Sequence, residues 1–594
     1  MVIVQPTGIV NASESPHPTS SEIERPSADR LLARLDRAHH APPDARTEAQ
    51  NGRTDSEPTW VTVDATLDAR AAAGVCILRT YASALPPHAW NEPQHYDNQR
   101  ATHQHEHIGS QVMSSQPAPI IIQGGMGAGV SGWPLARAVS LAGQLGVVSG
   151  TALDVILARR LQIGDPGGHM HRALEHFPIP GAAQRIITRY FIRDGKPTDR
   201  PFKPKPIFTE KPARHLEELV VTANFAEVFL AKEGHDAPIG INYLEKIQLP
   251  TLPSIYGAML AGVDYILMGA GIPRAIPGIL DRLAQALPVE LALTVQGADR
   301  NDRFMTHFDP AQFSQAAPNL VRPEFLAIVS SATLATMLAR KASGRVYGFV
   351  VEGPTAGGHN APPRGRQQLN DHGEPVYGER DRADLGAFRS IGLPFWVAGS
   401  CAEPERLSAA LKLGASGVQV GTAFAYCEES GLDPELKQTV LDMSRDGRAR
   451  VFTDPIASPT GFPFKVVQLE GTISDPSIYQ NRARICDLGY LRHAYKRHDG
   501  TLGWRCPGEP IADYVRKGGD AEDTCGRKCV CNGLLTNIGL GQIRRAGATE
   551  KPLITSGDDV ANVARFLKPG ADTYQAIDVI EYLLRDMNAT TCSS

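Results

Sequence analysis

Short runs of Val, Ile and Leu recur along the middle of this chain, separated by stretches with apolar residues at helical spacing. Such runs are typical of strands buried on both faces of a sheet. The predicted strands are residues 119–123, 146–149, 238–242, 263–268, 325–330, 347–352, 394–398 and 417–420. Eight strands alternating with helices favour a closed parallel barrel. We therefore predict an α/β fold of the (β/α)8 TIM barrel type.

Helix start and stop signals lie between several of these strands. Pro134 suits the first position of a helix, and Gly143 follows its last apolar residue as a stop signal. Ser331 can cap a helix that carries Leu334. Residues 291–295 offer an alternative, ninth strand inside an insertion, so the strand count rests on how that run is assigned.

The chain has 594 residues, which exceeds one ordinary core, so we expect a barrel with appendages. Residues 1–112 are poor in apolar runs and are predicted to be largely disordered. The barrel is expected over residues 113–424, with insertions at about 152–237 and 269–324. Residues 425–594 are expected to form a Cys-containing C-terminal extension packed on the barrel.

The composition argues against several classes of partner. A net charge of −4 and a pI near 6.5 lack the basic footprint of a nucleic-acid-binding protein. No window approaches about twenty apolar residues, so no membrane span is expected. The first residues lack a secretory signal, and a cytoplasmic location is the expectation. Met113 stands just before the first strand, which raises the hypothesis that translation starts there.

Two segments rich in small residues, 397–401 and 417–422, fall at the ends of the last two predicted strands. Small residues let backbone N–H groups approach an anion, and a following helix N-terminus attracts negative charge. Barrels of this type often bind phosphate after strands seven and eight. The alternative is that the glycines only make tight turns. The phosphate-binding candidates are Gly399, Ser400, Gln419, Gly421 and Thr422.

A glycine-rich turn with Gly124, Gly125 and Met126 follows the first predicted strand. Its spacing differs from a dinucleotide-binding fingerprint, and no acidic residue follows a second strand at the required distance. Glycines allow a flat ring to lie against the backbone, and Met126 can supply a polarizable contact. Taken alone, the motif would favour a tight turn with a buried methionine.

The sixth predicted strand ends in Glu352, and Gly357, Gly358 and His359 follow it. Residues at this position lie at the mouth of a barrel, where catalytic groups are found. The glycines allow a cofactor to approach closely, and an imidazole with an ordinary pKa of about 6.5 can act as a base. Isolated histidines are mostly structural, but this context makes His359 the best catalytic candidate.

Together these motifs resemble the nitronate monooxygenase family, formerly called 2-nitropropane dioxygenases. The motifs are Pro119-Ile-Ile-Ile-Gln123, Gly240-Ile-Asn242, Ala356-Gly-Gly-His359, Ala398-Gly-Ser400 and Gln419-Val-Gly-Thr422. The resemblance runs from about residue 119 to the last helices and is strongest to a long bacterial-type branch with a Cys-containing tail. The FMN-dependent, trans-acting enoyl reductases of fatty acid and polyketide synthesis share this barrel.

The resemblance implies FMN-dependent oxidation of alkyl nitronates by molecular oxygen, without NAD(P)H. It implies that His359 is the catalytic base and that Asn242 and Gly357 contact the flavin. It implies that Ser400, Gln419, Gly421 and Thr422 hold the flavin phosphate. The chain departs from the family at Glu352, where Gln is usual, and at Ser400, where Gly is usual. An ionised Glu352 would disfavour an anionic substrate unless the carboxylate is paired or protonated.

Two other functions stay open at this point. One is an NADPH-dependent enoyl reductase that acts on carrier-bound chains in fatty acid or polyketide biosynthesis. The other is a degenerate flavin- or nucleotide-binding scaffold without catalysis. A small-molecule substrate and molecular oxygen are the expected partners, and the sequence leaves the physiological substrate and the oligomeric state open.

Five of the nine cysteines lie between residues 486 and 531. Zinc takes four N or S ligands, usually from pairs two to four residues apart. Cys525 and Cys529 fit that spacing, but Cys529 and Cys531 are unusually close, and iron–sulfur ligation is a further alternative. Buried thiols that pack as small hydrophobes are the favoured interpretation, with no metal. The candidate ligands for zinc or an iron–sulfur cluster are Cys486, Cys506, Cys529 and Cys531.

Overall fold

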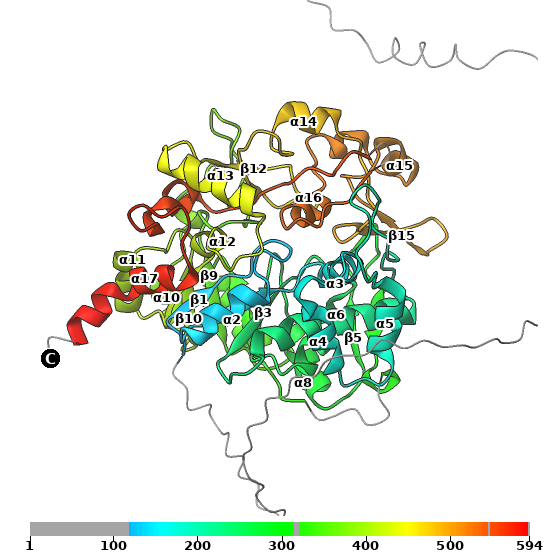
Figure 1. Ribbon diagram of the computed structural model, residues 1–594, viewed down its shortest axis with the longest axis horizontal. Helices are drawn as coiled ribbons and strands as arrows, with labels where there is room; N and C mark the ends of the chain where they lie inside the picture. Colours follow the sequence, from blue (N-terminus) through cyan, green and yellow to red (C-terminus); the bar gives the residue numbers. More distant parts are fainter. Residues whose placement is uncertain (1–117, 314–319, 545–546, 592–594) are drawn as a thin grey trace, which may run out of the picture. The chain divides into compact units, whose positions relative to one another are not determined.

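The computed structural model describes residues 118–313, 320–544 and 547–591 (Figure 1). The expectations for residues 1–112 and for a start at Met113 lie outside these residues. Within the described ranges, no helix has both the length and the apolar character that crossing a membrane requires.

Eight parallel strands form the central sheet, in the order β1-β11-β10-β9-β8-β4-β3-β2. They are β1 (Ile121–Gln123), β2 (Gly146–Ser149), β3 (Ile239–Leu244), β4 (Tyr265–Gly269), β8 (Glu324–Val329), β9 (Gly348–Glu352), β10 (Phe395–Ala398) and β11 (Gly417–Val420). Each of the eight coincides with a predicted strand. The predicted α/β barrel is therefore confirmed.

Backbone hydrogen bonds between β1 and the residue just before β2 close the ring. The Gln123 N–H donates to Leu145 O at 2.9 Å, and the Leu145 N–H donates to Ile121 O at 3.1 Å. The Gln123 side chain adds a third link, because its Oε1 accepts from the Val147 N–H at 2.9 Å. The first and last strands of the sheet are thus joined.

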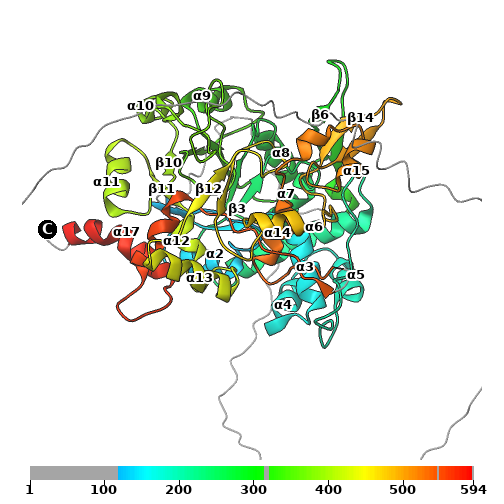
Figure 2. The ribbon, with the colours of Figure 1, turned by 90° about the horizontal axis from the view of Figure 1, so that it is seen from above.

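Helices surround the barrel, as Figure 2 shows from above. They are α2 (Trp133–Leu141), α3 (Leu153–Gln162), α6 (Arg214–Lys232), α7 (Thr251–Leu260), α8 (Ile276–Ala284), α9 (Ala332–Lys341), α10 (Leu385–Arg389) and α11 (Pro404–Lys412). The predicted capping of α9 is confirmed, since Ser331 Oγ accepts from the Leu334 N–H at 3.2 Å. Proline lies in the first turn of α2, α8 and α11, where its missing N–H costs nothing.

The insertions carry their own secondary structure. The first holds η1 (Pro166–Gly168), α4 (His169–Glu175) and α5 (Ala182–Tyr190), and the second holds β5 (Val289–Ala292), β6 (Val295–Gln296), β7 (Met305–Phe308) and η2 (Pro310–Gln312). The possible ninth strand inside an insertion, at residues 291–295, falls on β5 and β6, which both lie outside the barrel sheet. β5 pairs with β7 outside the barrel, and its residues alternate in exposure rather than being buried on both faces.

The C-terminal extension lies over the carboxyl ends of the barrel strands. In Figure 1 most of the extension is the yellow to orange layer above the blue and green barrel, while its red C-terminal helix lies beside the barrel. The Lys465 N–H donates to Gly358 O at 3.0 Å, and the Asn360 N–H donates to Pro463 O at 2.9 Å. These bonds attach the extension to the loop after β9.

This extension combines short helices with two hairpins. Its elements are α12 (Thr422–Ala425), α13 (Pro434–Arg445), β12 (Val451–Asp454), β13 (Phe464–Val467), α14 (Pro476–Asn481), β14 (His493–Lys496), β15 (Leu502–Arg505), α15 (Ile511–Arg516), η4 (Ala521–Thr524), α16 (Val530–Thr536), η6 (Asp558–Phe566) and α17 (Ala576–Thr591). The hairpins are β12–β13 and β14–β15. β14 also pairs in parallel with β6 of the second insertion, so the extension and the insertion share a sheet (Figure 2).

Apolar side chains fill the interior of the barrel. Ile122, Val147, Leu267, Leu326 and Val350 form a cluster there with no exposed surface. A filled interior is usual for this fold and leaves no channel through the ring. The packing therefore provides a floor for a site at the carboxyl ends of the strands.

Gly417 is a sensitive point of the barrel, because a Cβ there would lie 1.8 Å from Ile120 O. We expect Gly417→Ala to lower the unfolding free energy by about 1–3 kcal/mol or more, since β1 or β11 must shift. The control is Gly378→Ala, where a Cβ meets nothing within 4 Å and φ is −112°. Thermal unfolding followed by circular dichroism measures both, and equal midpoints would contradict the packing described here.

Candidate active site

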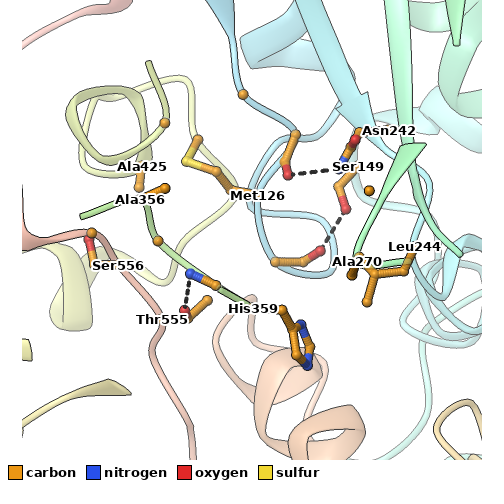
Figure 3. Close-up of a pocket in the computed structure, with 18 of the residues that line it drawn as sticks. Met126, Ser149, Asn242, Leu244, Ala270, Ala356, His359, Ala425, Thr555 and Ser556 are labelled. Carbon is orange, nitrogen blue, oxygen red and sulfur yellow. Dashed lines mark hydrogen bonds between the residues drawn. The ribbon is translucent and has the colours of Figure 1, made fainter. Parts of the chain in front are cut away.

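Every residue predicted to bind the cofactor or to act in catalysis lines one cavity at the mouth of the barrel (Figure 3). The glycine turn after β1, the end of β3, the loop after β9 and the ends of β10 and β11 contribute to it. The predicted residues in its wall are Gly124, Gly125, Met126, Asn242, Glu352, Gly357, Gly358, His359, Gly399, Ser400, Gln419, Gly421 and Thr422. Their individual roles remain predictions.

The glycines after β1 allow close contact with two other strand ends. A Cβ on Gly125 would lie 2.5 Å from Asn242 Cβ, so only glycine fits beside this asparagine. The Asn242 Nδ2 donates to Gly125 O at 3.4 Å. On the other side, a Cβ on Gly124 would lie 3.4 Å from Gly421 Cα. The ends of β1, β3 and β11 therefore lie close together at the cavity.

The loops after β10 and β11 show the tight backbone that phosphate binding was predicted to need. Gly399 has φ +107°, and a Cβ there would lie 2.9 Å from Thr355 Oγ1. Ser400 has φ +49°, a left-handed conformation that is strained for a residue other than glycine and that often marks functional loops. Gly421 lies beside Met126, whose Sδ would be 3.4 Å from an added Cβ.

Residues 555–557 of the extension form a wall of the cavity that the sequence interpretation missed. Thr555 Oγ1 accepts from the Gly358 N–H at 3.1 Å (Figure 3), and Thr422 Oγ1 accepts from the Gly557 N–H at 2.9 Å. A Cβ on Gly557 would lie 2.8 Å from Thr355 O. The run Thr555-Ser556-Gly557 just before η6 resembles the small-residue turns of the barrel, and that composition was the available signal.

Two buried polar atoms of the cavity wall have no hydrogen-bond partner among the described residues. They are Asn242 Oδ1 and Gln419 Oε1. A buried polar atom without a partner costs free energy, and a polar ligand in the cavity would pair with these atoms. Such atoms, set among glycine turns that admit a flat ring, fit a phosphorylated ring cofactor.

His359 is fixed by the extension. Its Nε2 lies 2.7 Å from Ser458 Oγ, and its ring centroid lies 4.7 Å from that of Phe464. Nδ1 has no hydrogen-bond partner in the described part of the chain. Burial lowers the pKa of His359 to about 4, so the ring is neutral at pH 7. A neutral ring with one free nitrogen can accept a proton from a substrate.

Glu352 ends β9 and lines the same cavity. Burial raises the pKa of its carboxyl group to about 8, so the group is mostly protonated at pH 7. A protonated carboxyl can donate a hydrogen bond, as the amide of glutamine does. The difference from the family's usual glutamine is therefore smaller than the charge of a carboxylate would suggest.

Asp559 is a second carboxyl group in the cavity wall that the sequence interpretation did not identify. Its Oδ2 accepts from Arg565 Nη2 at 2.8 Å, and the same guanidinium donates to Ala402 O at 2.8 Å. The arginine compensates the charge of Asp559 and links η6 to the loop after β10.

The cysteine hypothesis gains no support in the described residues, where no group of three or more His, Cys, Asp and Glu side chains could hold a metal ion. The thiols of Cys486 and Cys506 form a hydrogen bond, whereas Cys529 Sγ accepts from Asn532 Nδ2 at 3.4 Å. Cys531 lines the cavity. Burial raises the pKa of Cys529 and Cys531, whereas the hydrogen bond with Cys506 lowers the pKa of Cys486.

The fold and the site thus define a (β/α)8-barrel protein with a ligand cavity at its strand ends. The family model described as nitronate monooxygenase matches residues 298–454, which include His359 and the ends of β9, β10 and β11. A probable nitronate monooxygenase from Bacillus subtilis (strain 168) is 38% identical over 93 residues, which cover 16% of this chain and 25% of that protein. The chain therefore matches a quarter of the length of this curated relative. These matches confirm the predicted relationship to the nitronate monooxygenase family.

Solved structures with a similar arrangement include FabK from Thermotoga maritima, 16% identical with a TM-score of 0.39, over 80% of this chain and 95% of that chain. A nitroalkane oxidase from Streptomyces ansochromogenes is 17% identical with a TM-score of 0.37, over 80% and 98%. The enoyl reductase domain of MlnA from Bacillus amyloliquefaciens is 12% identical with a TM-score of 0.40, over 80% and 94%. At these scores the likenesses carry no functional conclusion.

Proposed function

We propose that this protein binds FMN in the cavity at the barrel mouth and oxidises alkyl nitronates with molecular oxygen. The observation that carries the proposal is the meeting, in one cavity, of a neutral His359, glycine turns and unpartnered polar atoms. Much of that cavity wall lies in the segment that matches the nitronate monooxygenase family model.

Each part of the wall has a role in this proposal. Gly124, Gly125, Met126 and Asn242 would hold the ring of FMN, and the turns after β10 and β11 would hold its phosphate. Ser556, in the same cavity wall, would offer an additional polar group to this ligand. A bound FMN would supply the redox chemistry, accepting electrons from the substrate and passing them to oxygen.

His359 would handle the proton of a substrate that enters as a neutral nitroalkane. In the tautomer that this role needs, the Nε2–H donates to Ser458 Oγ, which orients the ring, and Nδ1 is free to take the proton from the carbon beside the nitro group. The negative charge that develops on the substrate would raise the pKa of the neighbouring imidazole. The ring therefore becomes a stronger base as the proton moves.

Glu352 would contribute a hydrogen-bond donor rather than a negative charge. Its raised pKa keeps the carboxyl neutral at pH 7, and a neutral donor is compatible with an anionic nitronate in the same cavity. Ionisation above about pH 8 would place a like charge beside the substrate.

The direct test is the absorption spectrum of the purified protein, followed by two separate additions. We expect flavin bands, oxygen consumption on addition of an alkyl nitronate in air, and no bleaching by NADPH. Bleaching by NADPH with no oxidation of nitronate would instead favour the enoyl reductase. A colourless protein that takes up no added FMN would refute both enzymes and favour a scaffold.

His359→Gln should separate proton abstraction from the later oxidation. We expect kcat/KM for a neutral nitroalkane to fall roughly 100-fold or more, and that for the preformed nitronate to fall less than about tenfold. Steady-state oxygen consumption by flavin-loaded protein measures both. Equal losses on the two substrates would contradict a role for His359 as the base.

Glu352→Gln should change the pH dependence. In the native protein the neutral carboxyl ionises as the pH rises through about 8, so kcat/KM for a nitronate should fall above that pH. The glutamine variant cannot ionise and should keep its activity to about pH 9. Rate profiles of the two flavin-loaded proteins measure this, and an identical alkaline decline in both would argue against Glu352 as its source.

A further inference from the structure

A second cavity, here called the outer cavity, adjoins the one that contains His359. Tyr490 and Leu491 line both, so the two spaces meet at this pair. The outer cavity lies between the second insertion and the C-terminal extension, near the sheet that β6, β14 and β15 form. Its lining includes Lys246, Leu249, Leu293, Arg492, His493 and Trp504.

The junction between the cavities is held rigidly. The Tyr490 hydroxyl donates to the Asp154 carboxylate, and Asp154 Oδ2 lies 3.0 Å from Lys205 Nζ. The side chains of Asp154 and Lys205 are only 3% and 4% exposed. These three residues come from the extension, the helix after β2 and the first insertion. The position of Tyr490 between the two spaces is therefore fixed by three segments of the chain.

The wall of the outer cavity contains two basic side chains, Arg492 and Lys246. Arg492 donates to Phe208 O and Gly489 O and lies over the Trp504 ring at 5.6 Å. Among the described residues, no carboxylate oxygen lies within 4.0 Å of its guanidinium. Lys246 Nζ does have a carboxylate neighbour, Glu245 Oε2 at 3.5 Å.

Two further arginines add to this charge around His493. Arg505 donates to Gln296 Oε1 at 3.0 Å and Arg527 to Ser458 O at 2.6 Å, and both acceptors are neutral. Burial lowers the pKa of His493, and the nearby Arg527, Arg505 and Lys246 lower it further. Arg505 and Arg527 therefore add positive charge near His493, at the edge of the outer cavity, which an anionic group can compensate.

Apolar residues line both cavities between the basic side chains of the outer cavity and His359. Leu249 and Leu293 belong to the outer cavity, Leu491 to both, and Ile247 and Phe464 to the inner one. A ligand that bridges the two spaces would need an apolar middle, because burying a polar group beside these side chains costs free energy.

We propose that the outer cavity binds the anionic end of the substrate, a carboxylate or a phosphate carried on an apolar chain whose reactive carbon lies beside His359. This inference rests on the proposed function for the reactive end only. The anion site itself is defined by Arg492, Lys246 and His493, which are not part of the flavin-binding wall.

Binding can be measured without turnover. Flavin-loaded protein is titrated with octanoate, octyl phosphate and octanol in a calorimeter. We expect at least one anion to bind about tenfold more tightly than octanol, and the tighter anion distinguishes a carboxylate from a phosphate end. Octanol that binds as tightly as both anions would overturn the proposal.

Variants then locate the anion. Arg492→Gln and Lys246→Gln should each weaken anion binding about tenfold and leave octanol binding unchanged, whereas Arg492→Lys should largely keep it. Lys412→Gln, which removes a positive charge on α11 outside the outer cavity, is the matched control and should change nothing. If Arg492→Gln fails to fold, Lys246→Gln and Arg492→Lys test whether anion binding depends on these charges. Anion binding unaffected by loss of charge at Lys246 and Arg492 would overturn the proposal.

Steady-state kinetics with two nitronates can distinguish failure of this inference from failure of the proposed function. The nitronates of 1-nitrooctane and 8-nitrooctanoate have the same chain and differ in the distal charge. We expect a kcat/KM about tenfold higher for the carboxylated nitronate, with the difference lost in Arg492→Gln. If neither nitronate is oxidised, the proposed function fails, while the titrations still decide whether the outer cavity binds anions.

Discussion

The attachment of the C-terminal extension to the barrel mouth is the constraint on which the site depends. Gly358 is bonded on both backbone groups, to Thr555 Oγ1 and to the Lys465 N–H, and Thr422 is bonded to the Gly557 N–H. Through these contacts the extension covers the open end of the barrel and encloses a cavity there. Without them His359 would lose its partner Ser458 and the burial that sets its pKa.

Burial acts in opposite directions on the two titratable groups at the end of β9, with a common result. It lowers the pKa of His359 and raises that of Glu352, because in each case the charged form is the one that loses solvation. Both groups are therefore neutral near pH 7. A cavity that holds a neutral base and a neutral donor suits a substrate that brings or acquires negative charge, whereas the basic side chains Arg492 and Lys246 lie further out, in the outer cavity.

The predictable parts of this site follow from strand ends. Parallel strands in a barrel place their carboxyl ends together, so motifs as distant in the chain as Gly124, Asn242 and Thr422 can be assigned to one site from their positions after predicted strands. Residues 555–557 and Ser458 lie in irregular segments, and Asp559 lies in the short helix η6; the positions of all of them depend on long-range packing. Local sequence patterns carry little information about such packing, which is why these residues were missed.

The sequence by itself determined the eight buried strands, the barrel and the glycine turns. Hydrophobic periodicity and the position of glycines after a strand are local properties that can be read without the tertiary structure. It also marked His359 as the candidate base. Only the tertiary structure decided the protonation of His359 and Glu352, the roof over the cavity and the outer cavity beside Tyr490. Each of these depends on which distant segments exclude water from a side chain, and that exclusion arises only when the extension and the insertions pack on the barrel.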